Sequence, residues 1–330
     1  MIKRIDVLFC GGPFQKEDLK KALSTSEDVE VSVYSTDENY DPSSIKIIVG
    51  YKVDKVLLDS LPNLKLVHVP FAGVDILDLS IFYGRNIYIS NSHTNAKAVA
   101  EFAVSLLFSL VKKIPEFDRY MRKGVWKGRW ERERLDDFMD RSVTILGFGA
   151  IGKEISKMLA PFGMHIRAIK RNIYEEDKKF LNILEGLGTQ ERLLEFLEKS
   201  DYLIVSLPLT RETHEIIGEK EMDALGRKGF IVNISRGKVV NEEILFRRLK
   251  ENRLRGAALD VWWVYPRRAN PNPYPAHFPF WELDNVIMTP HTAGFTKNFV
   301  TLTLKETVEI IKNMANDILP SYIIDITREY

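Results

Sequence analysis

The sequence predicts an α/β protein with two Rossmann-like domains, each built on a parallel sheet. Three observations support this prediction. Short apolar runs alternate with helical patterns along most of the chain, which is typical of parallel strands joined by crossover helices. The length of 330 residues is sufficient for two α/β domains of ordinary size. A glycine-rich strand–turn–helix segment opens the second series of strands.

In the first part of the chain, five apolar runs predict strands at residues 5–9, 29–34, 45–49, 64–69 and 87–90. Helical patterns lie between them at residues 16–23 and 53–60. A long apolar-striped helix is predicted at residues 95–111, and a charged segment follows at 112–141. The first series of elements therefore ends near residue 94.

The second series begins with a strand at residues 143–146 and a helix at 151–160, and continues with strands at 164–169, 202–207, 230–234, 257–261 and 286–289. Residues 267–280 form a Pro-rich loop. The last helix, at about residues 297–318, can return to the first domain.

Composition excludes several classes of protein. Lys+Arg total 47 against Asp+Glu 46, which gives no electrostatic reason to expect a nucleic-acid or membrane partner. No apolar run is long enough for a transmembrane helix. Cys10 is the only cysteine, so we expect a reducing, cytoplasmic setting without disulfides, and we expect no metal site.

Residues 147–152 fit the pattern GxGxxG in a context that predicts a dinucleotide site. Gly147 would make the tight turn, Gly149 would let the backbone approach a pyrophosphate, and Gly152 would let helix and strand pack closely. The helix N-terminus would offer free N–H groups to the phosphates. The alternative is an incidental glycine turn. The predicted contact residues are Gly147, Gly149, Ala150, Ile151 and Gly152.

The end of the second strand indicates which nicotinamide cofactor is bound. NAD-binding proteins carry an acidic residue about 20 residues after the glycine motif, where it grips the ribose 2′-hydroxyl. Here that place holds Lys170, Arg171 and Asn172. Because two cations would attract a 2′-phosphate, we predict that NADP(H) is preferred. NAD(H) remains possible if both cations are solvated surface residues.

Polar residues follow several strands at the edge where ligands bind in open α/β sheets. Arg236 follows one strand and can hold a planar carboxylate with two hydrogen bonds. His291 follows another and can move a proton near neutral pH. The alternatives are that Arg236 merely caps a strand and that His291 is structural. Together, the two side chains predict hydride-transfer chemistry on a carbon next to a carboxylate.

Several segments resemble the D-isomer-specific 2-hydroxyacid dehydrogenase family, which includes glycerate and phosphoglycerate dehydrogenases and glyoxylate/hydroxypyruvate reductases. These are LKLVHVPFAGVD at 64–75, the NAxxVAE helix from 95, VNISRGKVVNEEIL at 232–245 and IMTPHTAG at 287–294. The resemblance implies that Arg236 binds the substrate and that His291 is the acid/base. It implies substrate contacts from Ala72, Gly73 and Val74, and cofactor contacts from Leu207, Pro208, Thr213, Ile234, Asp260, His291 and Gly294.

The resemblance also implies an organisation in two domains. A flavodoxin-like substrate domain is expected at residues 1–94 and 299–330, and the dinucleotide-binding domain at 95–298. A homodimer is expected through the helix at 95–111 and the arm after it. The apolar excess of that helix agrees with a dimer, although burial in the core explains it equally well.

One segment departs from the family pattern. The family usually reads LDVFxxEP, in which the Glu orients the His, whereas residues 259–266 read LDVWWVYP. Tyr265 therefore stands at the position of that Glu and cannot supply a carboxylate to hold His291 as imidazolium. Trp262 and Trp263 add bulk that we expect to narrow the pocket.

The sequence thus predicts an NAD(P)-dependent oxidoreductase that acts on a small 2-oxo or 2-hydroxy acid, of D stereochemistry by resemblance. Two alternatives stay open. One is a cofactor-binding sensor or interaction protein without turnover. The other is oxidation of a different small anion, in the manner of formate or phosphite dehydrogenases.

Overall fold

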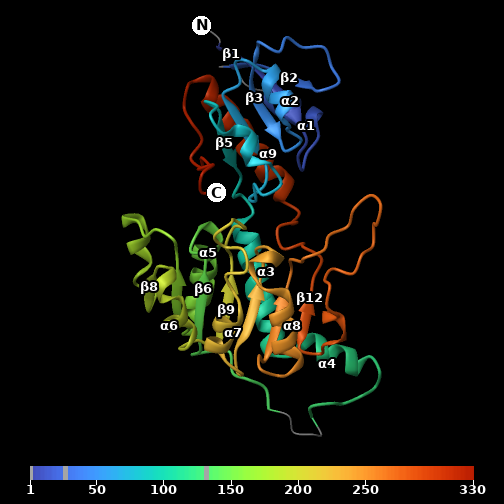
Figure 1. The fold of residues 1–330 in the computed structure, drawn as a ribbon, viewed down its shortest axis with the longest axis vertical. Helices are drawn as coiled ribbons and strands as arrows, with labels where there is room; N and C mark the ends of the chain where they lie inside the picture. Colours follow the sequence, from blue (N-terminus) through green and yellow to red (C-terminus); the bar gives the residue numbers. More distant parts are fainter. Residues whose placement is uncertain (1–2, 25–28, 130–133) are drawn as a thin grey trace. The chain divides into compact units, whose positions relative to one another are not determined.

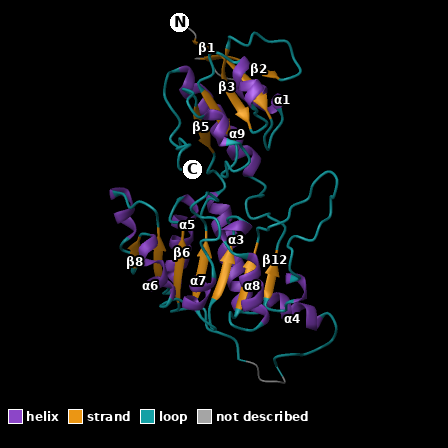
Figure 2. Ribbon diagram, viewed as in Figure 1, coloured by secondary structure: helices purple, strands orange, loops and turns teal. Residues whose placement is uncertain are grey.

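The computed structural model describes residues 3–24, 29–129 and 134–330, and the chain divides into two compact units (Figures 1 and 2). Unit 1 comprises Met1–Asn95 and Phe295–Tyr330, and unit 2 comprises Ala96–Gly294. The expected boundaries after residues 94 and 298 lie one and four residues from those of the units. That unit 1 takes the substrate and unit 2 the cofactor stays a prediction.

Unit 1 is built on a five-stranded parallel sheet in the order β2–β1–β3–β4–β5. This is the strand order of flavodoxin-like sheets, as expected. The strands are β1 (Lys3–Cys10), β2 (Val29–Ser35), β3 (Ile45–Gly50), β4 (Leu66–Val69) and β5 (Tyr88–Asn91). The helices are α1 (Lys16–Leu23), α2 (Lys55–Ser60) and α9 (Phe299–Ala315).

Helix α9 closes the core of unit 1 with residues from the far end of the chain. It packs against α1 and β1, and buries Ile310, Ile311 and Met314. These side chains join Val7 and Leu66 of the sheet in one apolar cluster. The helix predicted at residues 297–318 therefore does return to the first unit.

Unit 2 is a doubly wound, seven-stranded parallel sheet in the order β12–β11–β10–β9–β6–β7–β8. Its strands are β6 (Ser142–Leu146), β7 (His165–Ile169), β8 (Gly186–Gly188), β9 (Tyr202–Val205), β10 (Phe230–Asn233), β11 (Gly256–Leu259) and β12 (Val286–Met288). The order reverses between β6 and β9, and such a switch point is where ligands bind beyond the carboxyl ends of the strands. Strand β8 was not predicted, because two of its three residues are glycines.

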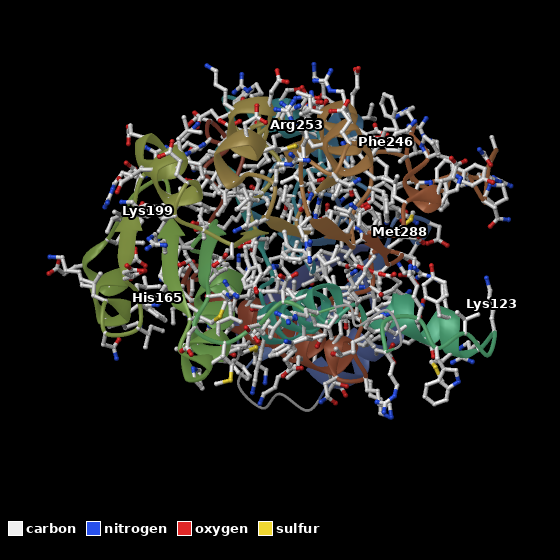
Figure 3. All side chains as sticks on the ribbon, turned by 90° about the horizontal axis from the view of Figure 1, so that it is seen from below. Lys123, His165, Lys199, Phe246, Arg253 and Met288 are labelled. Atoms are coloured by element: carbon white, nitrogen blue, oxygen red, sulfur yellow. The ribbon has the colours of Figure 1, made fainter. Side chains whose placement is uncertain are left out.

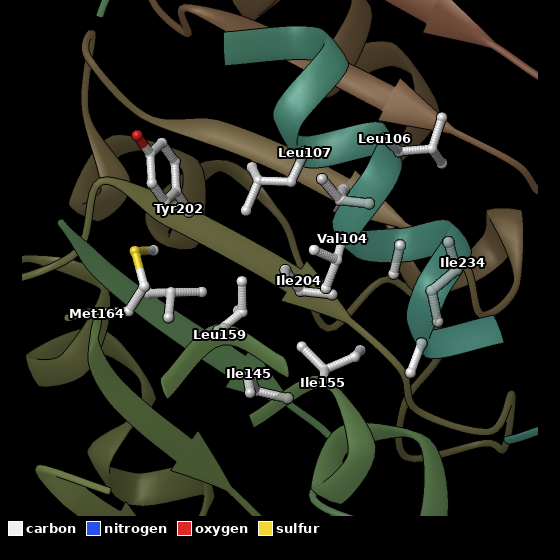
Figure 4. Packing of buried hydrophobic residues seen from close by; sticks show 14 of the residues in the cluster. Val104, Leu106, Leu107, Ile145, Ile155, Leu159, Met164, Tyr202, Ile204 and Ile234 are labelled. Atoms are coloured by element: carbon white, nitrogen blue, oxygen red, sulfur yellow. The ribbon is translucent and has the colours of Figure 1, made fainter. Parts of the chain in front are cut away.

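Helices cover both faces of this sheet: α3 (Ala96–Val111), α5 (Ala150–Leu159), α6 (Leu193–Leu197), α7 (Glu219–Leu225) and α8 (Glu242–Lys250), with α4 (Ile114–Met121) after α3. Leu107 of α3 and Ile155 of α5 meet Ile145 and Ile204 of the sheet (Figure 4). Charged side chains such as Lys123 and Arg253 lie at the periphery (Figure 3). Among the helices of the described residues, none is long and apolar enough to cross a membrane.

Candidate active site

The glycine turn between β6 and α5 has the geometry that a dinucleotide needs. Gly147 has φ +104°, and a Cβ there would lie 2.6 Å from the carbonyl oxygen of Ser206. A Cβ at Gly152 would overlap the carbonyl oxygen of Gly147. By contrast, a Cβ at Gly149 would meet nothing within 4 Å. The turn thus packs tightly on the protein side and is open at Gly149, where α5 begins.

This open side fits a pyrophosphate. The N-terminal residues of α5, which begins at Ala150, present backbone N–H groups that no earlier helical residue can satisfy. A dinucleotide would bind there with its phosphates at the positive end of the helix dipole. The residues present therefore fit the cofactor that the sequence predicts.

The two cations after β7 are both paired. The ammonium of Lys170 lies 2.6 Å from Asp177, which also lies 2.6 Å from the ammonium of Lys153 and accepts from the backbone N–H of Tyr174 at 3.0 Å. Burial would raise the pKa of Asp177, but the two ammonium groups outweigh burial and hold that pKa below its usual value. Arg171 pairs with Glu212. Asp177 and Lys153 were not found from the sequence.

Different partners make the two cations unequal as phosphate ligands. Asp177 is fully buried, so its carboxylate has little access to water and depends on the ion pair with Lys170. Glu212 has a side chain that is 68% exposed, and surface ion pairs of this kind contribute little. A phosphate can therefore compete for Arg171 far more easily than for Lys170.

Thr213, predicted to contact the cofactor, closes the loop that follows β9. Its hydroxyl donates to the carbonyl of Pro208 at 2.6 Å and accepts from the backbone N–H of Thr210 at 2.8 Å. The loop from Leu207 onward is thereby held in one shape beside the glycine turn, since β9 pairs with β6. A cofactor contact from Thr213 itself stays a prediction.

Arg236 lies on a loop that follows Ile234 and is shaped by one buried side chain. Asn233, the last residue of β10, donates to the carbonyl of Arg236 at 3.0 Å and accepts from the backbone N–H of Ser235 at 3.0 Å. A Cβ at Gly237 would overlap the carbonyl of Trp262, so this loop passes close to the segment after β11. Asn233 was missed by the sequence reasoning, although a polar residue ending a buried strand is a usable signal.

His291 occupies a left-handed backbone conformation, with φ +58°. Non-glycine residues rarely adopt it, and at functional sites such strain is sustained by the surroundings. Asp260 provides that support: its fully buried carboxylate accepts from Thr289 Oγ1 at 2.6 Å, Thr292 N–H at 3.0 Å and Ala293 N–H at 2.9 Å. Asp260 therefore holds the His291 loop from Thr289 to Ala293, in addition to any contact with the cofactor.

Tyr265 contacts His291 directly. Its hydroxyl oxygen lies 2.9 Å from Nδ1 of His291 and accepts the backbone N–H of Trp262 at 3.2 Å. The expectation that Trp262 and Trp263 narrow the pocket is wrong. Trp262 is only 6% exposed and donates its indole N–H to the carbonyl of Thr289, while Trp263 stacks on Phe280. Both indoles face the core because each finds an apolar neighbour and a carbonyl there.

Unit 1 carries the loop that contains Ala72, Gly73 and Val74. The side-chain amide of Asn91 donates to the carbonyl of Ala72 at 2.6 Å, and Val74 is buried. This places the loop at the carboxyl end of β4, beside the end of β5. Within the ranges that the structure covers, no three His, Cys, Asp or Glu side chains gather as metal ligands.

Fold, glycine turn and strand-end side chains together define a nicotinamide-dependent dehydrogenase. Residues 104–293 match the family model of the D-isomer specific 2-hydroxyacid dehydrogenase, NAD binding domain. A glyoxylate reductase of Korarchaeum cryptofilum is 33% identical over 73% of this chain and 70% of its own length. A glyoxylate/hydroxypyruvate reductase A of Arabidopsis thaliana is 34% identical over 77% of both.

Solved structures agree with these sequence matches. A D-isomer specific 2-hydroxyacid dehydrogenase from Xanthobacter autotrophicus, in complex with NADPH and MES, superposes with a TM-score of 0.81 and 25% identity. The match covers 98% of this chain and 99% of that one. The chain belongs to the D-isomer specific 2-hydroxyacid dehydrogenase family. It is an NAD(P)-dependent oxidoreductase that transfers a hydride between the nicotinamide and a small 2-oxo or 2-hydroxy acid.

Proposed function

We propose that the protein reduces glyoxylate, hydroxypyruvate or a 2-oxo acid of similar size, with NADPH as preferred cofactor, and forms the D-2-hydroxy acid. The observation that carries this proposal is the pair Arg236 and His291, on braced loops after β10 and β12, which flank β11. The relatives named glyoxylate reductase support the choice of a short substrate.

The chemistry assigns one task to each side chain. The nicotinamide, when bound, supplies or accepts the hydride. Arg236 holds the substrate carboxylate through two parallel hydrogen bonds, so the 2-oxo group keeps one orientation. His291 gives a proton to the carbonyl oxygen as negative charge develops on it. From the resemblance, the backbone of residues 72–74 donates to the same carboxylate.

Preference for NADPH rests on Arg171. The nearest buried carboxylate downstream is Asp177, which is already paired with Lys153 and Lys170 and accepts the N–H of Tyr174; Glu175 and Glu176 before it are exposed. Arg171 is the cation that a 2′-phosphate can recruit, because its partner Glu212 is exposed.

We also infer a homodimer in a reducing, cytoplasmic setting. Helix α3 buries its apolar face in the core of unit 2, so the composition of this helix no longer supports a dimer. The support comes from the segment after it, where Ile114, Met121 and Trp126 are each about half exposed. Light scattering of the purified chain tests this.

Cys10, the only cysteine, is buried, and burial raises the pKa of its thiol to about 12.

A substrate panel tests the proposed activity. NADPH and NADH oxidation is followed at the nicotinamide absorbance with glyoxylate, hydroxypyruvate and longer 2-oxo acids. Arg236→Lys keeps the charge but loses the fork, so kcat/KM should fall roughly ten- to a hundredfold while cofactor affinity persists. Arg247→Lys, at a half-exposed position on α8, is the matched control and should change nothing.

Three results would overturn this assignment. An unchanged kcat/KM of Arg236→Lys would remove the carboxylate clamp. Cofactor binding without turnover on any 2-oxo acid would favour a sensor. Oxidation of formate or phosphite with NAD⁺ or NADP⁺ would favour the other small-anion chemistry.

A further inference from the structure

The hydrogen bond between Tyr265 and His291 lies beside a backbone donor that also contacts the phenol oxygen. A phenol hydroxyl carries one proton and accepts through its lone pairs. The backbone N–H of Trp262 can only donate, so at 3.2 Å it occupies a lone pair of the Tyr265 oxygen. Of the two arrangements that the tautomers of His291 allow, we take the one in which the phenol proton points at Nδ1, 2.9 Å away. In this arrangement Nδ1 accepts, and the proton of a neutral imidazole resides on Nε2.

We infer that Tyr265 is a positioning residue and proton source for His291: it holds the neutral imidazole in the Nε2–H tautomer and resupplies the proton that the imidazole gives up. This inference rests on the proposed role of His291 as the acid. A carboxylate at position 265 would instead accept from Nδ1–H and favour the imidazolium. The two side chains therefore support different protonation states of the same imidazole.

The proton transfer balances without a charged imidazole. In reduction, the hydride reaches C2 of the 2-oxo acid and the carbonyl electron pair moves to oxygen. That oxygen takes the proton from Nε2 of His291, while Nδ1 takes the phenol proton of Tyr265. His291 ends neutral in the opposite tautomer, and Tyr265 ends as phenolate. Because Tyr265 is 38% exposed, water can return its proton.

The charged groups on the neighbouring strand ends do not replace this relay. Asp260, at the end of β11, already accepts three hydrogen bonds from the loop of His291. Arg236, on the loop after β10, is permanently charged and has no proton to give. The rate of reduction should therefore depend on protonation of the phenol rather than of an imidazolium.

This gives the pH profile of kcat/KM a specific shape. With an imidazolium as acid, reduction declines above the ordinary imidazole pKa of about 6.5. With the Tyr265 relay, it stays level until the phenol loses its proton, ordinarily near pH 10. Tyr265→Glu should restore a decline that begins near neutral pH. Tyr265→Phe should lower kcat/KM about tenfold at pH 8, from loss of one hydrogen bond in the transition state, and recover toward acid pH.

A second measurement needs neither substrate nor cofactor. Nitrogen NMR of the histidine side chains distinguishes the two tautomers. Wild-type His291 should show the Nε2–H form, whereas Tyr265→Phe should show a mixture. Tyr274→Phe, at a position 67% exposed in the same unit, is the matched control and should alter neither readout.

The outcomes separate this inference from the proposed function. If His291→Gln keeps full activity, His291 is not the acid and the proposed mechanism fails. If His291→Gln is inactive but Tyr265→Phe matches wild type in pH profile and tautomer, only the relay is overturned. A wild-type profile that declines from pH 6.5 would also overturn it, since it would show an imidazolium donor.

Discussion

His68 should make unit 1 sensitive to acid. It lies fully buried on β4, with Nδ1 2.9 Å from Ser90 Oγ and Nε2 3.3 Å from Thr307 Oγ1. Thr307 donates its own proton to the carbonyl of Thr303 at 2.8 Å, so it must accept from Nε2–H. The imidazole is thus satisfied as a neutral ring. Burial lowers its pKa to about 3, because a charged ring would lose its hydration there.

The sign and size of the effect follow from linkage. The unfolded chain binds a proton at His68 below about pH 6.5, whereas the folded chain does so only near pH 3. The contribution of neutral His68 to the free energy of unfolding is therefore fully present above pH 6.5. It is lost as the pH falls toward 3. At pH 5 the loss is about 2 kcal/mol, because pH 5 lies about 1.5 units below the pKa of the unfolded imidazole. Each of those units stabilises the protonated unfolded state by about 1.4 kcal/mol. This value changes little for any folded pKa below about 4.

Urea unfolding followed by far-UV circular dichroism at pH 7.5 and pH 5 measures this loss. Tryptophan fluorescence is unsuitable because unit 1 contains no tryptophan. His68→Gln removes the titrating group, so its stability difference between the two pH values should be about 2 kcal/mol smaller than that of wild type. His214→Gln, at an exposed position, should behave like wild type. Equal pH dependence in wild type and His68→Gln would refute the reasoning.

Two further predictions concern the cofactor. Arg171→Ser should raise the KM for NADPH about tenfold and leave the KM for NADH nearly unchanged. Glu212→Gln should lower the KM for NADPH, because it releases Arg171 from its partner. Steady-state kinetics with both cofactors measures these changes, and equal effects on NADH would contradict the assignment. Gly149→Ala should fold normally, because its Cβ meets nothing within 4 Å, yet it should bind NADPH weakly. Gly152→Ala should lower the melting temperature, because its Cβ would overlap backbone. If titration calorimetry shows that Gly149→Ala keeps its affinity for NADPH, the pyrophosphate binds elsewhere.

Element type could be read from the sequence where periodicity is strong. The helix predicted at residues 16–23 is α1, and that predicted at 95–111 is α3 but for its first residue. Strand ends were less predictable: the run predicted at 202–207 ends as a strand at Val205, because its partner Asn233 ends β10 there. Strand β8 exists only through pairing with Arg167–Ile169, a contact distant in sequence that a glycine-rich segment does not indicate.

The candidate site divides in the same way. Residues with distinctive chemistry, such as Arg236 and His291, could be named because their types and strand-end positions are visible in the sequence. Their electrostatic partners could not. Asp177 neutralises Lys170 from seven residues away, and only the turn between them brings the two together. Similarly, the sequence shows that Tyr265 lacks a carboxylate, but not that its hydroxyl reaches His291.

The hydrogen bonds that hold the Arg236 and His291 loops are joined to each other, which makes the proposed clamp and the proposed acid one structural unit. The side chain of Asn233 holds the carbonyl of Arg236, and the backbone carbonyl of Asn233 accepts the N–H of Asp260 at 3.0 Å. The side chain of Asp260 in turn holds Thr292, the residue after His291. Each link is a hydrogen bond to a fully buried group, which is costly to break. The distance between the guanidinium proposed to bind the carboxylate and the imidazole proposed to deliver a proton is thereby set by three adjacent strand ends rather than by mobile loops.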